Sequence, residues 1–367
     1  MDFNTAENFI INKQSLGIKP GLSRIEKLLR KMGNPQESLK IIHIAGTNGK
    51  GSVAAMIANA LQKNGFKTGL FTSPWVTEYR EQIQINGEFI PKSDFAEYVA
   101  AYKDADATEF ELLTAIMYKY FADEAVDYAV VECGMGGLED STNAFSHPEL
   151  AVITCVAMDH MNFLGKALSE IAVQKAGIIK NNSVCVLYPN PKCEDVFENR
   201  CAETGSRLIK IADYGDFKLN NLKTAEAALD FLNVKIAPAL PKLPARTEML
   251  ASNVMVDGAH NENGANALEK SLPHKNITAV VGMMADKDYD SYLRIIAQHC
   301  KKIIATTPSN SRALPAERLA EAARKYCGDV CAVPNPEKAL QLARKDFEFL
   351  LVCGSFYLAR DLRKYLL

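Results

Sequence analysis

The sequence predicts an α/β protein with two domains, each built around a parallel sheet. Apolar, β-branched runs alternate with helical patterns along most of the chain, as in IIHIA (41–45) followed by VAAMIANALQKNG (53–65). Strands that alternate with helices form crossover units and parallel sheets. A proline-rich stretch, IAPALPKLPAR (236–246), separates two such sets, which is typical of a linker between domains.

The order of the runs sets the expected domain boundaries. We expect a first domain at residues 1–238, a linker at 239–247 and a smaller second domain at 248–367, close to a single doubly wound unit. Strands of the first domain are predicted at 41–45, 128–132, 151–156 and 183–188. Strands of the second are predicted at 254–258, 277–283, 301–307 and 349–354, with helices at 265–272, 288–299 and 316–326.

Composition and charge exclude several classes of protein. The 367 residues are 48% hydrophobic and 23% charged, values typical of a globular chain. The 42 Lys and Arg against 44 Asp and Glu give a net charge of −2, which argues against non-specific nucleic-acid binding. The sequence has neither an apolar run of about 20 residues nor a signal-like start. We therefore expect a cytoplasmic protein that binds neither membranes nor nucleic acid, with its nine cysteines as reduced core thiols. A monomer is the default expectation for a two-domain architecture of this kind.

A glycine-rich loop follows the first predicted strand and precedes a helix. In such a turn the backbone amides, a lysine and a hydroxyl can hold a polyphosphate and its magnesium ion. The spacing differs from the common Walker form, which disfavours a standard small GTPase or kinase. A flexible glycine turn is the alternative, but the lysine among three glycines favours phosphate binding. The loop residues are Gly46, Thr47, Asn48, Gly49, Lys50, Gly51 and Ser52.

Two more strand ends carry polar side chains. Glu132 ends the strand YAVVE, and Asp159 with His160 follows AVITCV. Ligands of open parallel sheets bind outside the carboxyl ends of strands, so Glu132 is well placed for magnesium. From position alone, Glu132 could also be a solvated acid and His160 a hydrogen-bonded structural residue. Lys175, within the helical pattern SEIAVQKAG, is by itself typical of a solvated helix face.

A series of segments, in order along the chain, resembles the folylpolyglutamate synthase and dihydrofolate synthase family of the Mur ligase superfamily. The resemblance extends from about Ile41 to the C-terminus. It implies an N-terminal P-loop domain of the Mur ligase type that binds ATP, and a C-terminal Rossmann-like ligase domain. The segments are GTNGKGS, FTSPW, FELLTAIM, ECGMGGLEDSTN, AMDHMNFLG, QKAGI, LPAR, VDGAHN and VCGSFYL.

The resemblance also implies roles for single residues. Ser73, Glu132 and His160 would hold Mg²⁺, and Lys175, which the family carbamylates, would be an anionic ligand for a second metal. Arg246 and Asp257 would contact ATP, and His260 would act on the incoming amino acid when the domains close. The residues so assigned to catalysis are Lys50, Lys175, His160 and His260.

At four positions the chain departs from the family pattern. Trp75 stands where the family commonly has His, and Leu138 and Gln82 stand where Arg is frequent. Thr224 stands where the family usually has an Asn in the helix that contacts adenine. Because the phosphate loop and the metal candidates are retained, ATP activation is expected to persist. The loss of two cations beside the acceptor leaves the acceptor less defined.

The function predicted is ATP-dependent addition of L-glutamate to a pterin or folate carboxylate through an acyl phosphate. The small-molecule partners would be ATP, glutamate and dihydropteroate or a folate. One alternative is a Mur-type ligase for a non-folate carboxylate, and another is a nucleotide switch that hydrolyses ATP without ligation. A cell-wall ligase is disfavoured because only some 40 residues precede the loop, too few for a separate UDP-binding domain.

Overall fold

Two mostly parallel sheets, each flanked by helices, confirm the predicted α/β class. The computed structural model describes residues 1–17, 19–240, 242–273 and 276–367. Among these residues, no helix combines the length and the apolar character that a membrane span requires. All nine cysteines are free thiols, six of them buried and three half-buried.

The chain divides into two units that are not contiguous in sequence. Unit 1 comprises Met1–Pro74, Tyr79–Ala157 and Met161–Pro241, and unit 2 comprises Trp75–Glu78, Met158–His160 and Lys242–Leu367. The change to unit 2 after Pro241 falls within the expected linker, of which residue 241 lies outside the described residues. The linear boundaries at 238 and 248 stay a prediction, because two short segments of the first half belong to unit 2.

The sheet of unit 1 has the strand order β4-β3-β2-β5-β1-β6-β7-β8. The strands from β2 to β8 pair in parallel, and only β3 and β4 are antiparallel. The carboxyl ends of β1, β2, β5 and β6 therefore share one edge, where parallel sheets bind ligands. The strands are β1 Ile41–Ala45, β2 Thr68–Phe71, β3 Ile83–Ile85, β4 Glu88–Phe89, β5 Tyr128–Glu132, β6 Leu150–Ile153, β7 Val184–Leu187 and β8 Arg207–Lys210.

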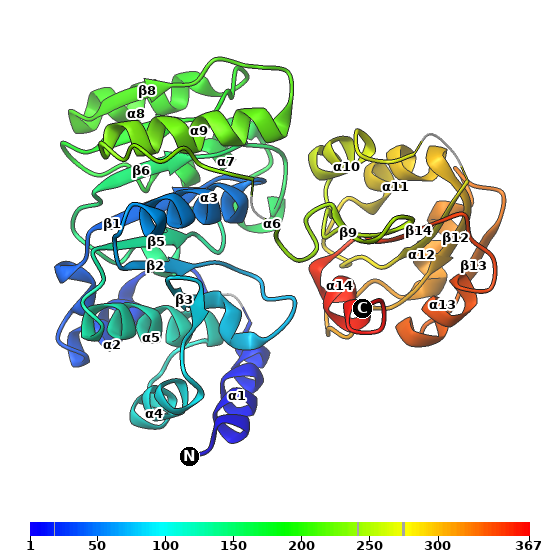
Figure 1. Cartoon of the computed structure of the whole chain (residues 1–367), viewed down its shortest axis with the longest axis horizontal. Helices are drawn as coiled ribbons and strands as arrows, with labels where there is room; N and C mark the ends of the chain where they lie inside the picture. Colours follow the sequence, from blue (N-terminus) through cyan, green and yellow to red (C-terminus); the bar gives the residue numbers. More distant parts are fainter. Residues whose placement is uncertain (18, 241, 274–275) are drawn as a thin grey trace. The chain divides into compact units, whose positions relative to one another are not determined.

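Helices cover both faces of this sheet (Figure 1). Helices α3 and α9 share one apolar core with β1, and α7 and α8 share another. The helices, with short 3₁₀ turns marked η, are α1 Phe3–Asn12, η1 Lys13–Leu16, α2 Ser23–Lys31, η2 Pro35–Ser38, α3 Lys50–Lys63, η3 Tyr79–Gln82, α4 Lys92–Tyr102, α5 Glu109–Asp123, η4 Ser141–Asn143, α6 Met161–Leu164, α7 Leu168–Ala176, α8 Glu194–Thr204 and α9 Phe217–Phe231.

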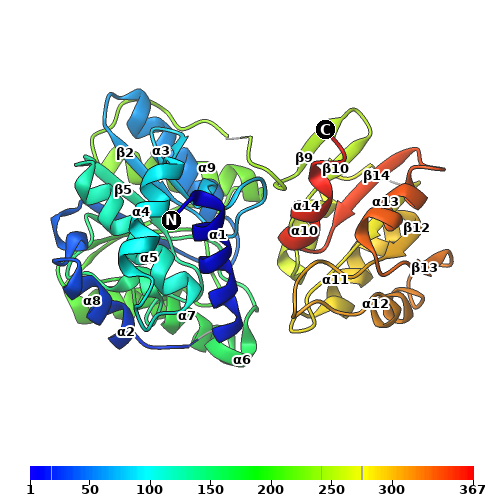
Figure 2. The same ribbon diagram turned by 90° about the horizontal axis from the view of Figure 1, so that it is seen from below.

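Unit 2 has a smaller sheet, in the order β13-β12-β11-β14-β10-β9, with β9 antiparallel at one edge. Helices α11 and α12 pack on one face, and α13 and α14 pack on the other (Figure 2). The elements are β9 Glu248–Ala251, β10 Val254–Val256, α10 Glu262–Glu269, β11 Ile277–Val281, α11 Tyr289–Ile296, η5 Ala297–His299, β12 Cys300–Ala305, α12 Ala316–Ala323, β13 Val330–Ala332, α13 Pro336–Ala343, β14 Phe349–Cys353 and α14 Phe356–Arg363.

The helices predicted for unit 2 exist, and their ends follow local capping. The helix expected at 265–272 begins three residues earlier, because the Asn261 side chain accepts a hydrogen bond from the Gly264 amide at 2.8 Å. The helix expected at 288–299 is divided into α11 and η5. The helix expected at 316–326 ends at Ala323.

Strand β1 contains one titratable side chain among apolar neighbours. His43 is fully buried, and burial, followed by the charge of Lys180, lowers its pKa from 6.5 to about 3. The native protein thus keeps a neutral imidazole inside the sheet, where a charged one would be costly to desolvate.

This buried imidazole should make unit 1 sensitive to acid. Because the pKa of His43 is lower in the folded chain, the unfolded chain takes up the proton first as pH falls. His43 should then cost about 1.4 kcal/mol of unfolding free energy for each pH unit below 6.5. In urea unfolding from pH 7 to pH 5, the wild type should lose about 2 kcal/mol more than His43→Leu. Equal pH slopes would contradict the neutral, buried state.

Candidate functional site

The predicted phosphate loop connects β1 to α3 at the ligand-binding edge of the unit 1 sheet. Helix α3 begins at Lys50, with Gly49 as its N-cap at φ 87°. A methyl group on Gly46 would lie 1.9 Å from Thr154 Oγ1, and one on Gly49 would lie 2.6 Å from Asn221 Oδ1. Both positions therefore require glycine, as the sequence predicts for a loop that approaches an anion closely.

Neighbouring strand ends anchor the first half of the loop. The amides of Thr47 and Asn48 donate to Cys155 O at 2.7 and 3.3 Å, and Thr154 Oγ1 donates to Asn48 O at 2.9 Å. These two amides are already used within the protein. The donors that suit a phosphate are the first amides of α3, at Lys50, Gly51 and Ser52, because the first turn of a helix leaves its N–H groups without intrahelical partners.

Glu132 lies beside the loop lysine at the end of β5. Its side chain is 2% exposed, and Oε1 is 3.9 Å from Lys50 Nζ. Its other oxygen, Oε2, accepts from the Ser73 amide at 3.1 Å. Lys50 Nζ also donates to Thr47 O at 3.1 Å. The structure thus brings together Lys50, Ser73 and Glu132, which come from three separate segments of the sequence.

Lys175 is a buried residue, although its sequence context alone is typical of a solvated helix face. It is 2% exposed near the end of α7, and its Nζ donates to Gly46 O at 2.9 Å. The side chain therefore points to the first residue of the phosphate loop. A buried ammonium at this place is consistent with a group reserved for chemistry.

The donor set of unit 1 fits Mg²⁺ held together with a nucleotide. No group of three or more His, Cys, Asp or Glu side chains able to hold a metal occurs among the described residues. Mg²⁺ typically uses one or two carboxylates, and phosphate oxygens with water complete its coordination. One buried carboxylate at Glu132, bonded to the Ser73 amide and beside a phosphate loop, matches this pattern.

Unit 2 gathers a second polar group around Asp159. Its carboxylate accepts from Lys287 Nζ at 2.5 Å and from Asn261 Nδ2 at 2.9 Å, and it lies 3.4 Å from His260 Nε2. Lys287 Nζ is also 3.2 Å from His160 Nε2. Burial alone would raise the pKa of Asp159, but His260, His160 and Lys287 hold that pKa well below its usual range. The group therefore contains a permanent carboxylate at neutral pH.

Sequence reasoning missed Lys287 and Asn261. Lys287 lies in the segment ADKD, a few residues beyond the carboxyl end of β11, so the rule that placed Glu132 at a strand end could have found it. Asn261 ends the VDGAHN segment and was given no role. It both caps α10 and donates to Asp159.

Arg246 and Asp257, both predicted to contact ATP, lie in unit 2. The Arg246 guanidinium stacks over the Phe356 ring at 4.1 Å. Asp257 accepts from the amides of Ala259 and Thr247, each at 2.7 Å. Burial raises the pKa of Asp257, and these two hydrogen bonds oppose the rise.

The four departures from the family pattern have different surroundings. The ring of Trp75 lies under the Arg360 guanidinium at 4.2 Å. Gln82 is buried and donates to Tyr79 O at 3.1 Å, whereas Leu138 is 42% exposed. The hydroxyl of fully buried Thr224 donates to its own helix at Asn220 O, so the side chain that faces the loop from α9 is Asn221.

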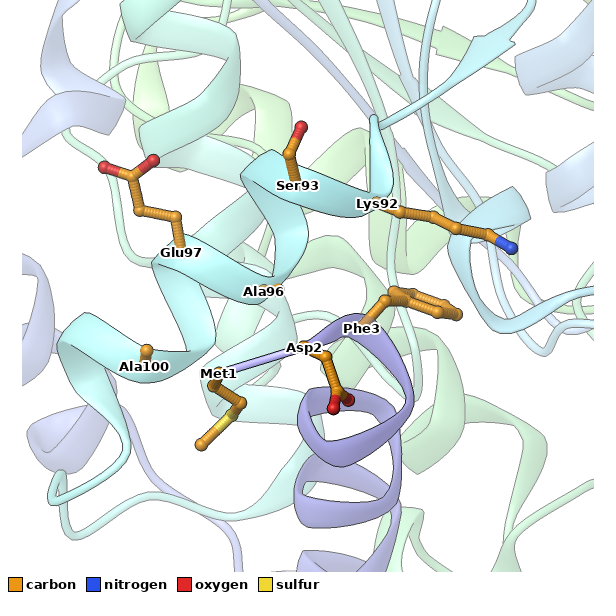
Figure 3. A pocket seen from close by; sticks show the side chains of 8 residues that line it. All are labelled: Met1, Asp2, Phe3, Lys92, Ser93, Ala96, Glu97 and Ala100. Atoms are coloured by element: carbon orange, nitrogen blue, oxygen red, sulfur yellow. The ribbon is translucent and has the colours of Figure 1, made fainter.

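A hollow of about 490 Å³ lies apart from these groups, between α1 and α4 (Figure 3). Its walls are mostly apolar, and no residue that the sequence assigned to a site lines it. The lining residues are Met1, Asp2, Phe3, Lys92, Ser93, Ala96, Glu97 and Ala100. We assign it no part in the chemistry.

Comparison with known proteins gives two adjoining domain matches. The family model of the Mur ligase middle domain matches residues 44–259. The model of the Mur ligase, glutamate ligase domain matches residues 245–356. Together they cover the phosphate loop, Glu132, Lys175 and the polar group of unit 2.

Relatives that match over nearly the whole chain identify the family within the Mur ligases. The chain is 33% identical to a folylpolyglutamate synthase of Lacticaseibacillus casei, with 94% of each chain covered. It is 29% identical to a dihydrofolate synthase/folylpolyglutamate synthase of Bacillus subtilis, with 99% of each covered. Among solved structures, Escherichia coli FolC in complex with DHPP and ADP matches with a TM-score of 0.89 and 25% identity, covering 100% of this chain and 98% of that one. Mycobacterium tuberculosis folylpolyglutamate synthase complexed with ADP matches with a TM-score of 0.87 and 28% identity, over 98% and 99%. The chain therefore belongs to the folylpolyglutamate synthase and dihydrofolate synthase family of the Mur ligases.

Proposed function

We propose that this protein is an ATP-dependent ligase that adds L-glutamate to the carboxylate of a pterin or folate. The observation that carries the proposal is the meeting of Lys50, Ser73, Glu132 and Lys175 at the phosphate loop of unit 1. Relatives that align with this chain over nearly their whole length carry the two synthase names, and two matched structures hold ADP. The acceptor is proposed from these relatives and not from the geometry.

The reaction would proceed in two steps. An oxygen of the acceptor carboxylate attacks the γ-phosphorus of ATP, which forms an acyl phosphate and releases ADP. The glutamate nitrogen then attacks the acyl carbon, the amide bond forms, and phosphate leaves as the amine loses a proton. The first step is needed because a carboxylate is a poor electrophile, whereas phosphate is a good leaving group.

The residues of unit 1 would stabilise the charge that accumulates in this reaction. Lys50 and the first amides of α3 would hold the phosphates. Ser73 and Glu132 would hold Mg²⁺, with His160 and carbamylated Lys175 as further ligands. The metal supplies positive charge to the phosphate oxygens. Arg246, Asp257 and His260 are proposed to act on the nucleotide and on the incoming amine.

The test is an assay with ATP, Mg²⁺ and L-glutamate, and with either dihydropteroate or tetrahydrofolate as acceptor. Release of ADP should require both the acceptor and glutamate, and mass spectrometry should show a product heavier by one glutamyl unit. ATP hydrolysis that ignores both compounds would favour the nucleotide switch. Activity restricted to a carboxylate without a pterin would favour the non-folate ligase.

A further inference from the structure

A chain of buried hydrogen bonds lies behind the proposed metal ligands of unit 1. His43 Nε2 is 2.8 Å from Thr142 Oγ1 and 3.1 Å from the Sγ of Cys133, the residue that follows Glu132. Thr142 Oγ1 donates to Asp140 Oδ1 at 2.5 Å. Because the Thr142 proton is given to Asp140, the Thr142 oxygen accepts from His43, which places the imidazole proton on Nε2.

The chain continues into the glycine turn that follows Glu132. Asp140 Oδ2 accepts from the Met135 amide at 2.7 Å, which fixes the start of the turn. At its far end, the Leu138 amide donates to Gln174 O at 2.7 Å. A methyl group on Gly137 would lie 2.8 Å from that same oxygen, so the turn and the last turn of α7 are in close contact.

Asn143 strengthens the connection between this turn and α7. Its Nδ2 lies 3.2 Å from both Leu138 O and Gly177 O. Lys175 lies in that last helical turn, and its Nζ donates to Gly46 O. Gly46 directly follows β1, which carries His43. The contacts therefore connect His43 on β1, through the glycine turn and α7, to Gly46 at the end of β1. Glu132 directly precedes the glycine turn, and Lys175 lies on the helix that the far end of the turn contacts.

A histidine at position 43 is energetically unfavourable compared with an apolar residue. The other four positions of β1 are isoleucine or alanine, and every position is buried. Its Nδ1 is buried and has no hydrogen-bond partner among the residues that the structure describes. An apolar side chain would avoid the desolvation of two ring nitrogens. Retention of a polar group at this cost is consistent with a requirement for a fixed local geometry.

We propose that His43 is a positioning residue for the metal site, which sets the spacing of Glu132 and Lys175 through Thr142, Asp140 and the glycine turn. This role rests on the proposed function, since it requires these two residues to hold the metal. His43 itself touches neither metal nor substrate. Side chains behind metal ligands commonly control metal affinity by about 10- to 100-fold.

The experiment compares His43→Leu with His43→Gln. Leucine replaces the donor with an apolar side chain of similar size, whereas glutamine carries an N–H donor at a similar distance from the backbone. Mn²⁺ binding is followed by electron paramagnetic resonance on protein saturated with a non-hydrolysable ATP analogue. Nucleotide affinity is measured separately by calorimetry in EDTA, and unfolding at pH 7 is recorded for each variant.

His43→Leu should weaken Mn²⁺ binding by about 10-fold or more, with nucleotide affinity in EDTA unchanged. His43→Gln should restore most of the metal affinity. Equal Mn²⁺ affinity in wild type and His43→Leu would overturn the role, as would equal losses in the two variants. If His43→Leu did not fold, a comparison of Thr142→Val with Thr142→Ser would serve instead, because valine removes the hydroxyl that accepts the hydrogen bond from His43, and serine keeps it. A wild type that bound the nucleotide analogue but no Mn²⁺ would refute the proposed function and this role together.

Discussion

Replacement of Lys50 by alanine is expected to lower the rate of acceptor-dependent ADP release by about 10²- to 10³-fold. Lys50 Nζ donates to Thr47 O and lies 3.9 Å from Glu132 Oε1 at the start of α3. An ammonium at this place can approach the phosphates. Its charge would stabilise the negative charge that develops as the γ-phosphoryl group moves to the acceptor. Alanine leaves the loop backbone in place and removes only this cation. The measurement is the initial rate at saturating ATP, Mg²⁺, acceptor and glutamate.

A matched control comes from the same helix. Lys63 is an exposed lysine at the other end of α3, so Lys63→Ala should keep wild-type turnover. Glu132→Ala should lose turnover as severely as Lys50→Ala, because it removes the buried carboxylate proposed for Mg²⁺. Circular dichroism and the unfolding midpoint show whether each variant keeps its fold. Near-normal product formation by folded Lys50→Ala or Glu132→Ala would remove that residue from the mechanism.

The central strands could be predicted because their physical signal is local. Strands β1 and β5 are buried at every position, so they read as continuous apolar runs bounded by turn residues. The edge strands gave a weaker signal. Strand β8 consists of Arg207–Lys210, with exposed ends and a half-buried middle, and β4 has only two residues. Such segments become strands through pairing with a neighbour, which composition does not record.

The site was predictable where it follows from strand ends. The glycine loop and Glu132 lie directly after β1 and at the end of β5, and parallel pairing brings them to one edge. The contact from Lys175 to Gly46 spans 129 positions and that from Lys287 to Asp159 spans 128. No local pattern encodes contacts of this kind. Lys175 was singled out only through the family resemblance, and Lys287 was missed.

Thr224 shows the limit of matching a family pattern position by position. The sequence indicates only that an asparagine is absent there. In the structure the Thr224 hydroxyl is bonded within α9, and Asn221, one turn earlier, lies against Gly49. Residues three apart share a helix face. An amide side chain is therefore present on the face towards the loop, although not at the expected position.

The positive charge of Lys175 conflicts with a metal ion at the proposed site, and carbamylation of the lysine would remove this conflict. An ammonium next to a proposed Mg²⁺ site would repel the metal, yet the side chain is 2% exposed and directed at the phosphate loop. Carbamylation joins the neutral amine to CO₂ and releases one proton, so that a carboxylate replaces the cation. The charge at this position would then favour the metal.

Loss of this group should be as damaging as loss of Glu132. Lys175→Met, which keeps a long side chain but cannot be carbamylated, is expected to lower turnover by about 10²- to 10³-fold. Wild-type protein incubated with ¹³C-labelled bicarbonate should show a carbamate carbon resonance that is absent from the variant. Gln174→Ala, one residue earlier on α7, serves as the control and should keep the resonance, because alanine keeps both the backbone oxygen and the Cβ atom that face the glycine turn. A fully active wild type without the resonance would show that Lys175 acts as an ammonium, and the metal would then have to be held without it.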